Sequence, residues 1–564
     1  MAAEFAHDNP LIVQSDLSLL VEVKSPRYTE ARDALASFAE LVKSPEHIHT
    51  YRITPLSVWN ACASGDSAKS MIAVLHQFAR YDVPMVVDTK VNEWASRYGK
   101  LRLVRVEGEL FLTASDPAVE YLIVRNREIN GVLGEHASGI GYRINPDDRG
   151  RLKQVLVKAG YPAEDLAGYR VGEPLAVALR QQTTMAGATF ALRDYQIDAV
   201  DRFHAGGSER GGSGVVVLPC GAGKTVVGLA CMEKVGASAL ILTNNATAAR
   251  QWIAEILDKT ELDADEVGEY TGQQKHIRPV TVTTYQILTW RERKADPFRH
   301  MALFDERDWG LIIYDEVHLL PAPVFQATAG LQARRRLGLT ATLVREDGRE
   351  DDVFALIGPK KADVPWKVLE GQGWIAGAQC YEVRLPLDPD LRMDYALADK
   401  RAKFRVASEN PAKLAIVTQL LKKHATEQVL VIGMYVDQLK LLAADLGCPI
   451  IQGSTSQKKR EELFGAFRSG DLRVLVVSKV ANFAIDLPDA SVAIQVSGTF
   501  GSRQEEAQRL GRILRPKPGA NRAWFYTLVS RDTVEQDFAL NRQMFLCEQG
   551  YDYEVLDEIP QDQS

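Results

Sequence analysis

Short runs of consecutive apolar residues recur along the C-terminal part of the chain and alternate with longer amphipathic stretches. Runs of this length predict strands that are buried on both faces, and the stretches between them predict helices. The predicted buried strands are 215–218, 239–243, 311–315, 429–432, 474–477 and 492–496. Buried strands that alternate with crossover helices are typical of parallel α/β sheets, and the two groups of strands predict two such lobes.

The first 188 residues lack this regular alternation. Their periodicity predicts helices over 28–42, 67–81 and 147–159, strands over 101–106, 109–113 and 121–124, and a glycine-rich turn over 131–141. Mixed elements of this kind are typical of small α+β units. We expect an N-terminal α+β domain at 1–116, a small module with a polar linker at 117–188, a first lobe at 189–370 and a second lobe at 371–564.

A glycine-rich loop follows the first buried strand, where residues 214–225 read GVVVLPCGAGKT. Gly221 and Gly223 let backbone N–H groups approach a phosphate closely, because neither residue carries a Cβ atom. In a loop of this kind the Lys224 amine reaches the β- and γ-phosphates of ATP, and the Thr225 hydroxyl holds Mg²⁺. The residues expected to bind ATP in this loop are Gly221, Ala222, Gly223, Lys224 and Thr225.

Two further positions bear on nucleotide binding. Leu218 stands where the full phosphate-loop pattern has its first glycine, so the assignment depends on the motifs downstream. Gln196 lies at a predicted helix start before the loop, and its amide both donates and accepts hydrogen bonds. We therefore predict Gln196 as a contact to the adenine edge, with a solvated helix residue as the alternative.

Two adjacent carboxylates end another buried strand, where residues 311–318 read LIIYDEVH. Asp315 is suited to hold hydrated Mg²⁺, and Glu316 is suited to orient or deprotonate the attacking water. Acidic pairs are common in loops, but they are unusual at the end of an apolar strand downstream of a phosphate loop. Residues 338–342, GLTAT, form another strand end, and its hydroxyls are candidates for coupling the nucleotide state to the second lobe.

The second lobe contains no phosphate loop, but a basic helix is predicted near its end. Gln508, Arg512 and Arg515 fall on one face of that helix at spacings i, i+4 and i+7. We predict that Arg512 and Arg515 are catalytic arginines that reach across a cleft to the γ-phosphate. The alternative is a solvated basic helix face.

Composition limits the class of protein. The hydrophobic share of 46% and the charged share of 25% are those of a globular protein, and no apolar run approaches the roughly 18 residues of a membrane span. The N-terminus has no apolar signal-peptide core and the six cysteines form no C-x-x-C pair, so we expect a cytoplasmic protein without disulfides or zinc ribbons. The net charge of −7 argues against an indiscriminate polycation, whereas nucleic-acid binding needs only a local basic track.

Taken together, the motifs resemble superfamily 2 helicases and, in particular, the XPB (xeroderma pigmentosum group B) family. The segments that carry the resemblance are the DEVH box at 315–318, 338–343 with the following Arg345-Glu346-Asp347 triplet, 478–480, 483–488 and 504–515. The resemblance covers nearly the whole chain. It implies an α/β fold with two RecA-like lobes after smaller α+β modules, and an ATP-driven DNA helicase or translocase that moves 3′→5′ in DNA repair.

The resemblance also places the smaller parts. Residues 9–63 look like the family's N-terminal region, and about 117–179 stands where the family has its damage-recognition domain. The chain lacks the long charged insertions of nuclear members, so it resembles the compact prokaryotic form.

Two segments are candidates for DNA contact. The triplet Arg345, Glu346 and Asp347 is predicted to assist strand separation, since its two acids would repel a phosphate backbone. A thumb-like insertion is implied at about 388–410, where basic residues surround Phe404, whose ring would stack on bases. The basic residues are Lys400, Arg401, Lys403 and Arg405. The alternative for this insertion is a solvated helix.

Three hypotheses on function compete. The first is a DNA helicase that uses ATP and Mg²⁺ to open single-stranded, forked or damaged duplex DNA in the nucleoid. The second is a duplex translocase or an RNA remodeller that does not separate strands, because the same motor serves all of these. The third is an ATP-gated module that recruits a repair nuclease and hardly hydrolyses ATP, and the intact acid pair and the paired arginines argue against it.

Overall fold

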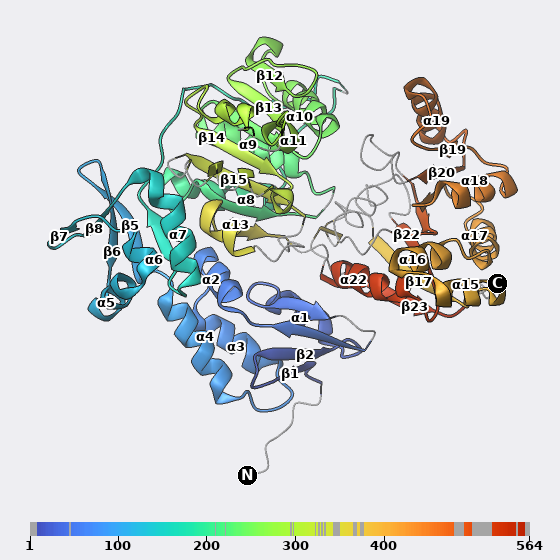
Figure 1. Ribbon diagram of the computed structural model, residues 1–564, viewed down its shortest axis with the longest axis horizontal. Helices are drawn as coiled ribbons and strands as arrows, with labels where there is room; N and C mark the ends of the chain where they lie inside the picture. The colour runs from blue at the N-terminus through green and yellow to red at the C-terminus, as the bar shows by residue number, and fades with distance from the viewer. Residues whose placement is uncertain are drawn as a thin grey trace.

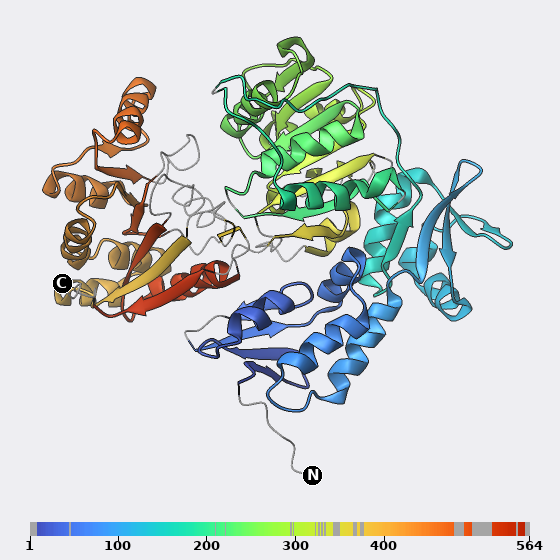
Figure 2. The same ribbon diagram turned by 180° about the vertical axis from the view of Figure 1, so that it is seen from behind.

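Four β-sheets organise the described part of the protein, and each draws its strands from one continuous part of the chain (Figure 1, Figure 2). The structure is a computed structural model. It describes residues 8–43, 47–185, 187–208, 210–219, 221–293, 296, 298–321, 323–324, 327–328, 331, 334–341, 350–364, 369–370, 372, 377–478, 490–498, 522–548 and 551–558. The predicted fold class, two parallel-sheet lobes preceded by smaller α+β parts, is confirmed.

The first lobe has a seven-stranded parallel sheet in the order β12-β13-β11-β14-β15-β10-β16. Its strands are β10 (Ser213–Val217), β11 (Ala239–Thr243), β12 (Val267–Tyr270), β13 (Val280–Thr284), β14 (Leu311–Asp315), β15 (Arg335–Thr340) and β16 (Lys360–Asp363). Its helices include α8 (Asp194–His204), α9 (Lys224–Val235), α10 (Ala246–Lys259), α11 (Tyr285–Leu288) and α13 (Glu350–Leu356).

Successive strand residues in this sheet supply two different cores. Val216 and Ile313 belong to one hydrophobic cluster, whereas Val215 and Ile312 belong to another, because neighbouring side chains on a strand point to opposite faces. Helices cover the sheet on both faces, so the central strands are apolar at nearly every position. This double coverage explains why short unbroken apolar runs predicted these strands correctly.

The second lobe has another seven-stranded parallel sheet, in the order β19-β20-β18-β21-β22-β17-β23. Its strands are β17 (Gly377–Leu385), β18 (Val429–Gly433), β19 (Ile450–Ile451), β20 (Val474–Ser478), β21 (Val492–Gln495), β22 (Arg522–Ser530) and β23 (Asp552–Leu556). Its helices include α15 (Arg392–Leu397), α16 (Lys400–Ser408), α17 (Ala412–Lys423), α18 (Val436–Asp445), α19 (Gln457–Ser469) and α22 (Val534–Glu548).

The N-terminal part is an antiparallel sheet of β1 (Leu11–Val13), β2 (Ser18–Glu22), β4 (Ile48–Arg52) and β3 (Glu40–Lys43), with four helices. The helices are α1 (Tyr28–Leu35), α2 (Pro55–Ser64), α3 (Ala68–Phe78) and α4 (Met85–Arg97). The helix predicted over 28–42 is wrong in its second half. The chain turns after Leu35, and Leu41 pairs with Tyr51 across the sheet, so tertiary pairing overrides the helical pattern.

The second small part is a five-stranded sheet in the order β7-β8-β6-β5-β9. Its strands are β5 (Leu101–Val106), β6 (Glu109–Ala114), β7 (His136–Ala137), β8 (Gly141–Ile144) and β9 (Ala163–Leu166), and its helices are α5 (Pro117–Arg125), α6 (Arg127–Asn130) and α7 (Arg149–Lys158). Because β5 and β6 belong to this sheet, a domain division at 116 cuts it, and we propose a division between α4 and β5 instead.

The strand predicted over 121–124 is wrong, since these residues lie in α5. The Asp116 side chain caps the helix by accepting a hydrogen bond from the Ala118 N–H at 2.9 Å, and Pro117 occupies the first turn. Val119 and Ile123, four residues apart, are buried on one face. These start signals and the i, i+4 burial outweigh the β-branched residues in the segment.

The N-terminal part contacts both lobes. The Ser64 hydroxyl donates to the Lys360 carbonyl at 2.5 Å, and the Lys360 N–H donates to Asn60 Oδ1 at 3.0 Å, which joins α2 to β16 of the first lobe. From the second lobe, α22 lies against β3, and its residue Cys547 belongs to the N-terminal hydrophobic cluster. Across the described part of the chain, no helix has the length and apolar character needed to cross a bilayer.

Candidate active site

The phosphate loop lies between β10 and α9, at the carboxyl edge of the first lobe's sheet. Gly221 and Gly223 have φ values of 81° and 79°, a conformation that L side chains rarely adopt. A Cβ atom at Gly223 would stand 2.6 Å from Gln196 Nε2, so a larger residue would displace the Gln196 amide in addition to straining the backbone. Helix α9 begins at Lys224, which leaves the free N–H groups of its first turn beside the loop.

Gln196 is buried, and its amide shapes this loop. Its Nε2 donates to the Ala222 carbonyl at 3.1 Å, and its Oε1 accepts from the Arg193 N–H at 3.0 Å. The Tyr195 hydroxyl donates to the same Ala222 carbonyl at 2.8 Å. Helix α8 is thereby tied to the loop, so the solvated-residue alternative is wrong, whereas the adenine contact of Gln196 stays a prediction.

Lys224 and Glu316 form an ion pair, with 3.0 Å between Nζ and Oε1. Their side chains are 13% and 15% exposed, so the charges attract each other with little screening by water. Burial alone would raise the pKa of Glu316, but Lys224 and then His318 hold that pKa below its ordinary value. Glu316 is therefore a carboxylate at neutral pH, as a group that accepts a proton from water must be.

The backbone at Glu316 is left-handed, with φ of 50° and ψ of 55°. This conformation costs a residue other than glycine roughly 1–3 kcal/mol and is concentrated at functional sites. It turns the chain sharply after β14 and directs the Glu316 side chain to the phosphate-loop lysine. The two motifs that the sequence predicts to cooperate are thus in direct contact.

Asp315 lies one residue earlier, and two aromatic residues hold it. The Trp252 indole Nε1–H donates to Asp315 Oδ2 at 2.9 Å, and the Tyr285 hydroxyl donates to the Asp315 carbonyl at 2.9 Å. Burial and the neighbouring Glu316 charge raise the pKa of Asp315 to about 6. The Trp252 hydrogen bond opposes that rise because it stabilises the ionised carboxylate.

His318 links the acid pair to the end of β15. Its Nδ1 lies 2.6 Å from the Thr340 hydroxyl and 3.5 Å from Glu316 Oε2. The first hydroxyl of the 338–342 segment is thus in contact with the DEVH box. This contact supports a coupling role for that strand end, which stays a prediction for the residues beyond Ala341.

The residue set fits ATP with Mg²⁺. The glycine loop offers backbone N–H groups, Lys224 a positive charge, and Asp315 one carboxylate for the metal. Within the described ranges no group of three or more His, Cys, Asp or Glu side chains could hold a metal ion. Mg²⁺ commonly binds through one or two carboxylates together with substrate phosphates, so it does not need such a group.

We expect replacement of Trp252 by Phe to move the acid limb of the ATPase pH profile upward by about one pH unit. The reason is that loss of the indole hydrogen bond raises the pKa of Asp315, and a hydrogen bond to a charged group contributes about 1.5–3 kcal/mol. The protonated carboxyl holds Mg²⁺ poorly, so the Mg²⁺ concentration for half-maximal rate should rise as the pH falls through this pKa.

The matched control is Trp309→Phe, since Trp309 is equally buried but donates to the Leu303 carbonyl at 3.0 Å. Its pH profile should coincide with that of the parent. A Trp252→Phe profile that also coincides with the parent would mean that the indole does not tune the acid.

The other predicted site residues are placed only in part. Arg345, Glu346, Asp347, Arg512 and Arg515 lie outside the described residues, so their roles stay predictions. In the thumb-like segment, Lys400 and Arg401 lie on α16, but the structure does not describe their side chains.

The stacking role predicted for Phe404 is wrong for this structure. The Phe404 side chain is 1% exposed, and its ring centroid lies 5.1 Å from that of Phe538 in α22 and 6.4 Å from that of Tyr435. A ring buried this deeply has no face to offer a base. Phe404 instead anchors α16 to the second lobe, and this role follows from hydrophobic burial.

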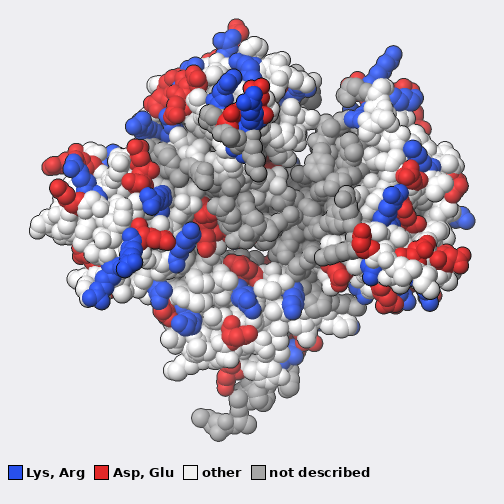
Figure 3. Space-filling model, viewed as in Figure 1, with Lys and Arg blue, Asp and Glu red and all other residues white. Residues whose placement is uncertain are grey.

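Two basic residues of α16 are described in full. Arg405 is 54% exposed and forms ion pairs with Glu409 at 3.1 Å and Asp437 at 3.5 Å. The Lys403 amine lies 5.5 Å from the centroid of the Tyr395 ring. The helix therefore presents a basic edge whose charge is partly balanced, and DNA contact by Lys403 and Arg405 stays a prediction. On the face shown in Figure 3, described basic and acidic side chains are interspersed.

Comparison with known proteins decides the family. Over 551 residues the chain is 56% identical to "DNA 3'-5' helicase XPB" of Kineococcus radiotolerans, and the match covers 98% of this chain and 97% of that protein. The chain belongs to the XPB family. A second family member, "DNA 3'-5' helicase XPB" of Mycobacterium tuberculosis, is 54% identical over 98% of each chain. An XPB subunit of "General transcription and DNA repair factor IIH" from Antonospora locustae is 34% identical, over 97% of this chain and 81% of that one.

Family profiles match separate parts of this XPB-family chain. The "ERCC3/RAD25/XPB C-terminal helicase" profile matches residues 369–564, and "Type III restriction enzyme, res subunit" matches 189–345. "Helicase conserved C-terminal domain" matches 11–138. Among solved structures, the Pyrococcus furiosus Hef helicase domain is 13% identical, with a TM-score of 0.43, over 62% of this chain and 97% of that one.

Proposed function

We propose that the loop at Gly221–Thr225 binds ATP and that Glu316 activates the water that hydrolyses it. The chain is an ATP-dependent DNA helicase of the XPB family. The observation that supports its active site best is the contact between the Lys224 amine and the Glu316 carboxylate, which joins the two motifs at one sheet edge. Such an arrangement suits phosphoryl transfer, in which positioning and charge stabilisation do most of the catalytic work.

Each residue near the loop has a distinct task in this proposal. Lys224 neutralises charge on the β- and γ-phosphates, and the backbone N–H groups of the loop bind phosphate oxygens. Asp315 and the Thr225 hydroxyl would hold Mg²⁺, which supplies charge neutralisation at the phosphates. Glu316 orients the attacking water and accepts its proton, and Arg512 or Arg515 from the second lobe stabilises the developing charge.

We further propose that the substrate is forked or damaged duplex DNA, opened with 3′→5′ polarity in the nucleoid. The relatives' names include both helicase and translocase, so movement along duplex without strand separation is the alternative. A repair nuclease is a candidate partner under the alternative of an ATP-gated recruiting module.

This function predicts that DNA, and not RNA of the same sequence, stimulates ATP hydrolysis. The steady-state ATPase rate measured without nucleic acid, with single-stranded DNA, with forked DNA and with an RNA duplex tests it. Equal stimulation by the RNA duplex would favour an RNA remodeller instead.

Alanine at Arg345, Glu346 and Asp347 together should leave DNA-stimulated ATPase within a few-fold of the parent but remove most duplex opening. The triplet follows a strand end and combines one guanidinium with two acids, which suits bracing a junction better than gripping phosphates. The ATPase rate and fork unwinding, measured on the same preparation, test whether the triplet acts in strand opening separately from ATP hydrolysis. Parallel loss of both activities, or unchanged unwinding, would contradict a separate role in strand opening.

A further inference from the structure

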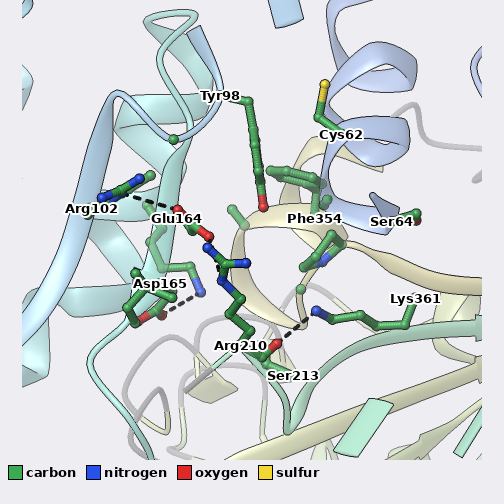
Figure 4. A pocket seen from close by; sticks show the side chains of 18 of the residues that line it. Cys62, Ser64, Tyr98, Arg102, Glu164, Asp165, Arg210, Ser213, Phe354 and Lys361 are labelled. Carbon is green, nitrogen blue, oxygen red and sulfur yellow. Dashed lines mark hydrogen bonds and ion pairs between the residues drawn. The ribbon is translucent and has the colours of Figure 1, made fainter. Parts of the chain in front are cut away.

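A cavity of about 440 Å³ lies where three parts of the chain meet, away from the phosphate loop. Cys62 and Ser64 come from α2 of the N-terminal part, Glu164 from β9 of the second sheet, and Phe354 and Lys361 from the first lobe. Figure 4 shows these side chains arranged around one space. Cavities of about 300–1,000 Å³ are the size that small ligands occupy.

The charges around this cavity are unbalanced. Asp165 accepts from Arg149 Nη2 at 2.6 Å and also lies 3.2 Å from Lys153 Nζ. Because two cations share one carboxylate, the pKa of Asp165 is held below its ordinary range, despite burial. This cluster therefore keeps a surplus of positive charge.

The second carboxylate is shared in the same way. Glu164 lies 3.3 Å from Arg102 Nε and 3.4 Å from Arg210 Nε, in two separate ion pairs. Among the described residues, four cationic side chains and two carboxylates line this cavity, and Arg149 and Arg336 lie beside Asp165. The fourth lining cation is Lys361.

Lys361 and Tyr98 are the most available polar groups. Lys361 Nζ donates to the Arg210 carbonyl at 2.9 Å, and no described carboxylate lies within ion-pair distance of it. Burial lowers the pKa of Lys361, so a bound anion would relieve an unfavourable charge. In Figure 4 the Tyr98 hydroxyl points into the same space, and it has no hydrogen-bond partner among the described residues.

We propose that this cavity binds a phosphate-bearing anion no larger than a nucleotide, held by Lys361, Arg210, Arg102 and the Tyr98 hydroxyl. A surplus of several positive charges fits a multiply charged phosphate better than a single carboxylate. The aromatic side chains of Tyr169 and Phe354 also line the cavity. Because the lining comes from three parts of the chain, the ligand would fix the second sheet and the N-terminal part against the first lobe. This site does not depend on ATP hydrolysis.

The probe is inorganic pyrophosphate, added to the full-length Lys224→Ala protein so that the phosphate loop does not dominate binding. Calorimetry should show binding, and adding Lys361→Met should weaken it at least about tenfold, because a hydrogen bond to a charged group is lost. Methionine keeps the aliphatic packing of the lysine stem. Arg210→Gln, at a side chain that is 71% exposed, is the second variant and should weaken binding without affecting the fold.

Lys234→Met is the matched control, because Lys234 also lies on the first lobe but pairs with Asp201 on the surface. The affinity of the Lys224→Ala/Lys234→Met protein for pyrophosphate should equal that of the Lys224→Ala parent. If that parent binds no pyrophosphate, or binds it equally well after Lys361→Met and after Arg210→Gln, the cavity is only a junction of salt bridges and the proposal fails.

A short DNA strand with and without a 5′-phosphate identifies the source of the phosphate. If the phosphorylated strand binds more tightly, and Lys361→Met removes this difference, the site binds a DNA end. Equal binding of both strands, with Lys361-dependent binding of pyrophosphate, assigns it to a free phosphate compound.

Discussion

Replacing Lys224 by Ala should abolish ATP hydrolysis while leaving DNA affinity nearly unchanged. The lysine is placed at the start of α9 with its amine 3.0 Å from Glu316, so its removal takes away the positive charge for the phosphates and the partner of the base. Loss of one preorganised electrostatic donor costs about 10²–10³-fold in kcat, and loss of the carboxylate's partner adds to this.

The measurements are steady-state ATPase and fluorescence anisotropy with labelled DNA, both on one preparation. Lys234→Ala, in the same helix, is the control, because the Lys234 side chain is 50% exposed and pairs only with Asp201 among described residues. The control should hydrolyse ATP like the parent. Near-normal hydrolysis by Lys224→Ala would remove the phosphate-loop assignment.

Replacing Glu316 by Gln should allow ATP to bind but slow turnover by about 10²–10⁴-fold, the usual contribution of a general base. The amide is nearly the same size as the carboxylate, so the left-handed turn at this residue and the position of Asp315 should persist. Gln cannot accept the proton of the attacking water. It also cannot pair electrostatically with Lys224, so the lysine should be freer to bind phosphate.

Nucleotide affinity measured with a fluorescent ATP analogue separates the two roles of Glu316. The expected result is affinity equal to or tighter than that of the parent, with turnover lost. Glu255→Gln, at a partly buried ion pair with Lys259 on α10, is the control and should change neither quantity. Loss of nucleotide binding in Glu316→Gln would show that the carboxylate is structural.

Local sequence patterns predicted that the phosphate loop and the acid pair belong to one candidate site. The phosphate loop and the acid pair are each contained in one strand end with its following loop, so their residue order fixes their geometry. Parallel strands then bring both motifs to the same carboxyl edge, and the ion pair between Lys224 and Glu316 confirms their meeting.

Features that depend on distant contacts could not be predicted in this way. Trp252 and Asp315 are 63 positions apart, and no spacing rule relates an indole on one helix to a carboxylate after another strand. The burial of Phe404 depends on α22, which lies far along the chain. The 121–124 segment differs for a local reason, because the Asp116 cap and Pro117 begin a helix that its β-branched residues do not prevent.

We infer that ATP hydrolysis at this site drives 3′→5′ opening of duplex DNA. The most direct measurement is strand displacement from forked DNA with a single 3′ or 5′ loading tail, with ATP, beside an RNA duplex of the same sequence. We expect ATP-dependent displacement of the 3′-tailed DNA, no displacement of the RNA, and no displacement by Glu316→Gln. ATP hydrolysis stimulated by these substrates without displacement of any DNA strand would contradict this inference and identify a translocase.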